Sequence, residues 1–203
     1  MTLLYLARHG ETAWNAAGRW QGQHDEPLSD LGIAQAAALA ARLGHEQIAS
    51  LYASDLRRAW DTATAIGAST GLAPLPDKRL REVDVGEWRG LTPDETKARY
   101  PEGFARWASG GTGWREGETY VAMRARAVEA VSEIIHKHRP DERICIVSHG
   151  GVIRALILHT LELADNHRRA LGTGPTATLS LIDVSADGGW RVLSYNDAGH
   201  LPR

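Results

Sequence analysis

Two apolar runs in this chain are each followed by the dipeptide His-Gly. Residues 3–7 lead into Arg8 and His9, and residues 144–147 lead, through a serine, into His149. Continuous β-prone runs of this length are typical of strands buried on both faces of a parallel sheet. Ligands of such sheets bind outside the carboxyl ends of the strands. If the two strands are parallel neighbours, the two imidazoles face each other across one crevice.

Other polar side chains follow two further predicted strands. Arg58 comes shortly after a strand at residues 48–53, and Glu82 follows an edge strand near residues 72–75. Arginine offers forked donors that match phosphoryl oxygens. The two glycines after the second histidine begin an apolar helix, and a helix N-terminus favours anions. This gathering of imidazoles, guanidinium groups and one carboxylate suits a phosphate dianion.

Strands and helices alternate along the chain, which predicts a three-layer α/β/α sandwich with a mainly parallel sheet and an antiparallel edge. The length suits a single domain over residues 1–203. Short polar side chains cap helices, so one helix is expected to begin at Ser29 or Asp30 and another at Ser54 or Asp55. The expected helices cover residues 30–43, 55–69, 119–137 and 152–163, and a hairpin closes the chain at residues 176–184 and 190–195.

Two segments differ in how strongly they indicate structure. Residues 91–118 contain prolines and a glycine-rich run at 110–113, which predicts a loop-rich insert with short helical pieces. The helix that follows has an apolar stripe at helical spacing, and this stripe predicts its buried face. The stripe consists of Val121, Ala125, Val128, Val131 and Ile135.

Seven tryptophans accompany a single phenylalanine. Five of them are expected in loops or in the insert, namely Trp14, Trp20, Trp88, Trp107 and Trp114. Two interpretations stay open for these five. Either they form the wall of a pocket above the phosphate site, or they pack long loops onto the domain.

The composition excludes several classes of partner. The apolar fraction of 43% and the charged fraction of 24% are typical of a globular protein, and a net charge of −2 gives no reason to expect nucleic acid or an anionic membrane as a partner.

Cys145 lies in an apolar strand, so we expect a core side chain without a disulfide or thiolate metal site. The remaining histidines lack metal-ligand spacing, and no metal site is predicted. Without a signal peptide or membrane span, the expected compartment is the cytoplasm.

Four sequence blocks contain the candidate site residues. They are Arg8-His9-Gly10-Glu11-Thr12 with Trp14-Asn15, Ser54-Asp55-Leu56-Arg57-Arg58-Ala59, Leu80-Arg81-Glu82 with Gly86 and Trp88, and Ser148-His149-Gly150-Gly151. Together, and in this order, the blocks resemble the histidine phosphatase superfamily of cofactor-dependent phosphoglycerate mutases and related phosphatases. The resemblance stretches from Arg8 to Gly151 and implies a phosphoglycerate mutase-like fold.

The resemblance also implies a role for each matching residue. His9 takes the phosphoryl group, while Glu82 protonates the leaving oxygen and later accepts a proton from water. The oxygens of the phosphate are held by Arg8, Asn15, Arg58 and His149. The family spacing selects Arg58 over its neighbour, which would be solvated or at the rim of the pocket. Asn15 has an alternative role as the cap of its own loop.

Three functions follow from the resemblance. The first is a metal-independent phosphatase, a phosphoric monoester hydrolase without cofactors that acts on a small phosphorylated metabolite. The second is a cofactor-dependent phosphoglycerate mutase, and the third is a catalytically silent binder of phospho-ligands. The run from Gly86 to Gly90 resembles the phosphatase branch. The insert at 91–118 would shape substrate choice, and the oligomeric state stays open, with a homodimer among the alternatives.

Overall fold

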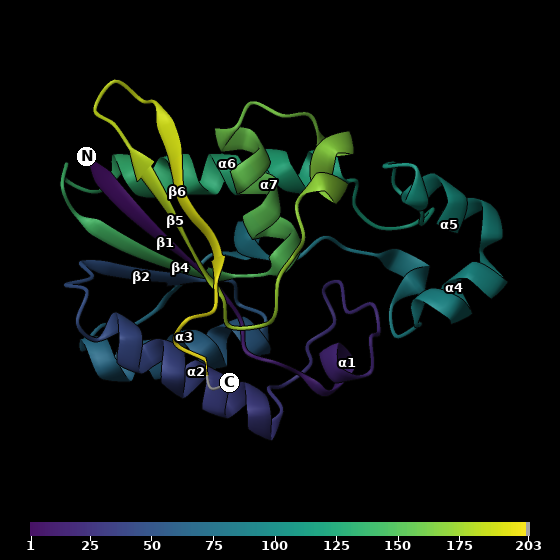
Figure 1. Ribbon diagram of the computed structural model, residues 1–203, viewed down its shortest axis with the longest axis horizontal. Coiled ribbons are helices and arrows are strands. Elements are labelled where there is room, and N and C mark those ends of the chain that lie inside the picture. The colour runs from purple at the N-terminus through teal and green to yellow at the C-terminus, as the bar shows by residue number, and fades with distance from the viewer. Residues whose placement is uncertain (202–203) are drawn as a thin grey trace.

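A six-stranded sheet lies between two layers of helices in the computed structural model, which describes residues 1–201 (Figure 1). The strand order is β3-β2-β4-β1-β5-β6. The strands β3, β2, β4 and β1 run parallel to one another, and β5 pairs antiparallel with both β1 and β6. This arrangement confirms the predicted fold class. The strands are β1 (Thr2–Arg8), β2 (Ser50–Ala53), β3 (Leu75–Pro76), β4 (Arg143–Ser148), β5 (Leu179–Val184) and β6 (Trp190–Asp197).

Helices α2 and α3 cover one face of the sheet, and α6 and α7 cover the other (Figure 1). The shorter helices α4 and α5 lie to one side of the sheet, beyond α1. No helix among the described residues is long and apolar enough to cross a membrane. The helices are α1 (Ala13–Ala16), α2 (Asp30–Leu43), α3 (Arg57–Thr70), α4 (Pro93–Arg99), α5 (Pro101–Ala108), α6 (Tyr120–His136) and α7 (Gly150–Thr160), with 3₁₀ turns at Lys78–Leu80, Gly86–Trp88 and Asp165–Ala170.

Between their polar end residues, the central strands β1 and β4 are apolar, and both of their faces are buried. In β1, Leu4 and Leu6 belong to the core cluster beneath α6 and α7, whereas Tyr5 and Ala7 belong to the cluster beneath α2 and α3. Successive side chains of a strand point to opposite faces, so each layer of helices receives alternate residues. The expected pairing is confirmed, because β1 and β4 are parallel neighbours.

The predicted cap of α3 is wrong. The helix begins at Arg57, and its N-cap is Leu56, which makes no side-chain capping bond. Instead, the carboxylate of Asp25 accepts a hydrogen bond of 2.6 Å from the Arg57 amide. Ser54 and Asp55 are committed elsewhere, to His149 and to an arginine in the next loop. Tertiary contacts therefore override the local capping preference.

The predicted buried stripe of α6 is correct only toward the end of the helix: Val131 is buried, and Val128 and Ile135 are half-buried against the core. The stripe is wrong at Val121 and Ala125, which are exposed. The buried face instead carries Met123, Ala127, Ala130 and Ile134, while Val121 is 66% exposed. Small residues at the centre of this face allow α6 to pack closely. The polar contacts of Arg126 fix the rotation of the helix, because this side chain binds a carboxylate and two loop carbonyls.

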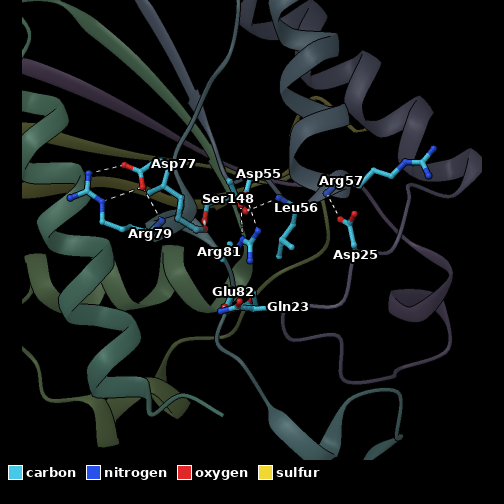
Figure 2. A network of polar contacts seen from close by, with 12 residues as sticks. Gln23, Asp25, Asp55, Leu56, Arg57, Asp77, Arg79, Arg81, Glu82 and Ser148 are labelled. Carbon is cyan, nitrogen blue, oxygen red and sulfur yellow. Dashed lines mark hydrogen bonds and ion pairs between the residues drawn. The ribbon is translucent and has the colours of Figure 1, made fainter.

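Residues 77–85 have little regular structure, but hydrogen bonds and ion pairs hold them against several neighbouring elements (Figure 2). The Arg81 guanidinium donates two hydrogen bonds of 2.6 Å to the carboxylate of Asp55, at the end of β2. The Ser148 hydroxyl, at the end of β4, donates to the Leu80 carbonyl at 2.7 Å. The Glu82 carbonyl accepts hydrogen bonds from the side-chain amide of Gln23 at 3.2 Å and from the guanidinium of Arg126, on α6, at 3.0 Å. The segment is therefore tied to two strands, one loop and one helix.

The ion pair of Asp55 and Arg81 is expected to contribute to stability. At pH 7, we expect Asp55→Asn to lower the free energy of unfolding by about 1–2 kcal/mol, because a forked, charge-assisted contact is lost. Hydrogen bonds from Arg81 lower the pKa of Asp55 below its ordinary value. The contribution is therefore present above about pH 4 and disappears as the pH falls through the lowered pKa. Urea unfolding at pH 7 and at low pH measures both effects.

A matched control variant distinguishes the loss of this one contact from a general loss of stability. Asp197 pairs with Arg42 at 2.7 Å and is similarly half-buried, but it lies at the end of β6. Amide hydrogen exchange of residues 80–84 should rise about tenfold in Asp55→Asn and stay unchanged in Asp197→Asn. Equal exchange of these amides in both variants would show that the ion pair does not hold the segment.

Candidate active site

His9 lies one residue beyond β1 and is buried, with 3% of its surface exposed. Its amide donates to the Ser148 carbonyl at 3.0 Å, which extends the β1–β4 pairing by one residue. The Nδ1 atom lies 2.6 Å from the Gly10 carbonyl oxygen. A carbonyl oxygen only accepts, so Nδ1 carries the proton and Nε2 keeps a free lone pair.

His149 lies at the same edge, as the N-cap residue of α7. The centroids of its ring and the His9 ring are 5.2 Å apart, so the predicted meeting of the two imidazoles is confirmed. Its Nε2 lies 2.8 Å from the Ser54 hydroxyl oxygen, whereas its buried Nδ1 has no hydrogen-bond partner in the described part of the chain. Ser54, which follows β2, thereby orients the second imidazole.

Two arginines flank the imidazoles, and backbone carbonyls hold both. Arg58 on α3 donates to the carbonyls of His24 at 2.6 Å and Gly22 at 2.8 Å. Arg8 donates to the Gly174 carbonyl at 2.8 Å. In both side chains Nε is buried and finds no acceptor within residues 1–201. Their hydrogen-bond acceptors are neutral carbonyls, and Glu82 acts on both charges only through space, so both groups keep donors for an anion.

Burial and positive charge keep the imidazoles neutral. Burial first, and then the charges of Arg58 and Arg8, lower the pKa of His9 well below its ordinary value. Burial, followed by Arg58, has the same effect on the pKa of His149. Burial also lowers the pKa of Arg58 to about 10, which leaves that guanidinium charged at neutral pH.

Glu82, in the segment of residues 77–85, lines the same cavity. Its carboxylate oxygens accept backbone hydrogen bonds of 2.9 Å from Val83 and from Gly151. A Cβ at position 151 would lie 2.2 Å from Oε1 of Glu82, so only glycine leaves room for this carboxylate. The second glycine of the His-Gly-Gly block therefore admits the carboxylate to the N-terminus of α7.

The alternative role considered for Asn15 is present in the structure. Its side-chain oxygen accepts from the Thr12 amide at 3.1 Å, while the Thr12 hydroxyl receives the Asn15 amide, in a reciprocal capping box at α1. Asn15 also lines the cavity, so the cap orients its side chain toward the other residues of the site. Arg57, by contrast, is solvated and pairs with Asp61 at 3.5 Å.

A cavity of about 170 Å³ brings the predicted residues together. It contains Arg8, His9, Asn15, Arg58 and Glu82 in its wall, whereas His149 contacts the ring of His9 but does not itself line the cavity. The sequence analysis did not predict a second group of lining residues. One of them, Arg154, was detectable, because it lies one helical turn beyond Gly150 of the His-Gly-Gly block. This group includes Arg19, Gln21, Tyr120, Arg154 and Thr173.

The tryptophans divide between the two interpretations. Trp88 is fully buried and packs against Trp20, Trp107 and Trp114, with ring centroids 5.4 to 6.4 Å apart. Trp20 alone among the five also lines the cavity. Trp14 stacks on the ring of His24. These rings mainly pack the insert, which contains more helix than the sequence predicts, onto the body of the protein.

No cluster of three or more metal-ligating side chains occurs in residues 1–201. The site consists of a neutral imidazole with a free lone pair, two guanidinium groups held by backbone carbonyls, and a carboxylate. These groups suit transfer of a phosphoryl group to nitrogen.

Comparisons with known proteins agree with this chemistry. The chain is 36% identical over 209 residues to a metal-independent phosphoserine phosphatase of Arabidopsis thaliana, with 99% of this chain and 84% of that protein covered. It is 40% identical over 178 residues to a glucosyl-3-phosphoglycerate phosphatase of Mycobacterium tuberculosis, with 83% and 79% covered. A solved mycobacterial glucosyl-3-phosphoglycerate phosphatase in complex with VO3 superposes with a TM-score of 0.88 at 37% identity, covering 97% and 99%.

The family assignment covers nearly the whole chain. The family model for the histidine phosphatase superfamily (branch 1) matches residues 4–198, which include all four sequence blocks and the whole sheet except the first two residues of β1. Since the match extends far beyond half of the chain and the relatives exceed 30% identity, this protein belongs to the histidine phosphatase superfamily, branch 1.

Proposed function

We propose that this protein is a phosphatase that hydrolyses small phosphomonoesters through a phosphohistidine at His9, with charge neutralisation by arginine in place of a metal ion. One observation carries the proposal. The neutral imidazole of His9, with Nδ1 bound to the Gly10 carbonyl and Nε2 free, shares one cavity with Arg8 and Arg58. A nucleophile and the cations needed for a phosphate dianion are thus already assembled.

In the first step, Nε2 of His9 attacks phosphorus and the bond to the leaving oxygen breaks. Glu82 gives its proton to that oxygen, so that a neutral alcohol departs. In the second step, water attacks phosphorus, the N–P bond breaks, and Glu82 takes a proton from the water. Inorganic phosphate leaves, and both side chains return to their starting states.

The phosphate oxygens have several donors available to them. The buried Nε atoms of Arg8 and Arg58 and Nδ1 of His149 have no partner in residues 1–201. If the Ser54 hydroxyl donates to Nε2 of His149, Nδ1 carries a proton and can donate to an oxygen of the transferring group. The side-chain NH2 group of Asn15 is a further donor for a phosphate oxygen. Such fixed donors stabilise the charge of the transition state.

The cavity size favours small substrates. A volume of about 170 Å³ lies below the roughly 300–1,000 Å³ typical of sites for drug-sized ligands. The relatives named above act, by their names, on phosphoserine and on glucosyl-3-phosphoglycerate. We infer that this protein takes a phosphorylated metabolite of comparable kind. The insert at 91–118 contributes to this choice through Glu95 of α4, which pairs at 2.9 Å with the cavity residue Arg19.

The direct test is the phosphoenzyme. We expect rapid acid-free quenching during turnover of a labelled phosphomonoester to trap acid-labile phosphate on His9. His9→Ala should lower turnover by about a thousandfold or more, because the nucleophile is gone. His136→Ala removes an exposed histidine of α6 and should retain activity in the presence of chelator. Bisphosphate-dependent isomerisation of 3-phosphoglycerate without phosphate release would instead indicate a mutase.

The role of Glu82 predicts a dependence on the leaving group. Glu82→Gln should slow hydrolysis of alkyl phosphates by about 100-fold or more, because a poor leaving oxygen needs a proton as it departs. Hydrolysis of nitrophenyl phosphate, whose leaving group needs little help, should fall much less in the first step. Burst-phase kinetics separate that step from hydrolysis of the phosphoenzyme. An equal loss in the first step for both substrates would contradict general-acid catalysis.

The neutral state of His9 predicts a pH dependence of stability. The pKa of His9 is depressed in the folded protein, whereas in the unfolded chain it lies near 6.5. Below that value the unfolded state binds a proton that the folded state does not, so stability falls as the pH falls. Between pH 6.5 and 5.5, wild type should lose about 1 kcal/mol more unfolding free energy than His9→Gln. Identical losses by urea titration would contradict a neutral nucleophile.

A further inference from the structure

One cavity residue has no part in the reaction proposed above. Arg154 lies on α7, one helical turn beyond Gly150, and its half-buried side chain lines the cavity together with Tyr120 and Thr173. A residue four positions along a helix projects from the same face. Because Gly150 also lines the cavity, Arg154 extends its wall away from the N-terminus of the helix.

Arg154 differs from the other cavity arginines in its polar contacts. Arg19 binds Glu95 and a carbonyl, while Arg8 and Arg58 each bind backbone carbonyls. Arg154 has neither a hydrogen bond nor an ion pair with any of residues 1–201. A guanidinium that faces a cavity without a partner can give its forked donors to a ligand.

The charges in the cavity point to the kind of ligand. A phosphate dianion is balanced by Arg8 and Arg58, Arg19 is balanced by Glu95, and Glu82 is uncharged when it is about to donate its proton. Arg154 then remains as one uncompensated positive charge. A carboxylate has one negative charge and the planar, two-oxygen shape that a guanidinium binds best. A second phosphate dianion would need more positive charge than this side chain supplies.

The geometry points to a specificity residue, and we propose that Arg154 binds a carboxylate on the leaving group. The preferred substrates would be small phosphomonoesters in which a short carbon chain joins the phosphate to a carboxylate. The cavity of about 170 Å³, with Val83 and Val85 in its wall, suits such a chain. The proposal rests on the phosphatase function and narrows its substrate class.

Paired substrates test the proposal on the intact protein. Phosphoserine and phosphoethanolamine differ only by the carboxylate, and 3-phosphoglycerate differs from glycerol 3-phosphate by a carboxylate in place of a hydroxymethyl group. In wild type, kcat/KM should be higher for the carboxylate member of each pair. Arg154→Met should lower kcat/KM by about 10- to 100-fold for these members and less than about threefold for the others. Arg154→Lys should restore part of the loss, because it keeps the charge but not the fork.

The controls distinguish this inference from the function on which it rests. Arg191→Met removes an exposed arginine of β6 and should leave both members of each pair unchanged. An equal loss for both members in Arg154→Met would indicate a structural role and overturn the inference. A larger loss of kcat/KM in Arg154→Met for an added bisphosphate substrate, such as glycerol bisphosphate, than for the carboxylate members would overturn it as well. If wild type hydrolysed none of the four substrates and no phosphoenzyme formed, the phosphatase function itself would fail.

Discussion

The parallel pairing of β1 with β4 is the constraint on which the site depends. Arg8 lies opposite Ser148 in the register of these strands, so the residue that follows each of them is a histidine at the same edge of the sheet. A shift of one residue would move every side chain of the shifted strand to the opposite face. The apolar residues of both strands oppose such a shift, because each face is buried under a separate helical layer. Burial of the core and placement of the imidazoles are therefore one requirement.

The site also has to keep positive charges away from water without neutralising them. Arg58 is almost completely buried, yet its partners are the carbonyls of Gly22 and His24, which satisfy its donors and leave its charge in place. A buried carboxylate partner would have compensated the cation and weakened its attraction for phosphate. The same charges disfavour protonation of His9, so in the proposed mechanism one arrangement serves both to bind the dianion and to preserve the nucleophile.

The sequence could predict this site because its residues follow strands or belong to short blocks whose order is distinctive. It could not predict which residue caps α3, because Ser54 and Asp55 have good local capping propensity but bind partners distant in the chain. It also could not fix the rotation of α6. Two apolar stripes compete there, and the contacts of Arg126 with the segment around Glu82 favour the one that contains Met123. In each case a long-range polar contact decided between local alternatives of similar quality.

The division between chemistry and specificity follows from the way in which each side chain is held. The reacting groups are held by backbone atoms: Glu82 by two amides, and His9 by the Gly10 carbonyl. Backbone contacts persist when neighbouring side chains change, which keeps the phosphoryl-transfer geometry constant. Arg154 lies on the same helix that receives Glu82 but is not held by a second residue within 1–201. Its replacement would leave the core and the reacting groups in place, so under the proposal this position alters substrate choice without disturbing catalysis.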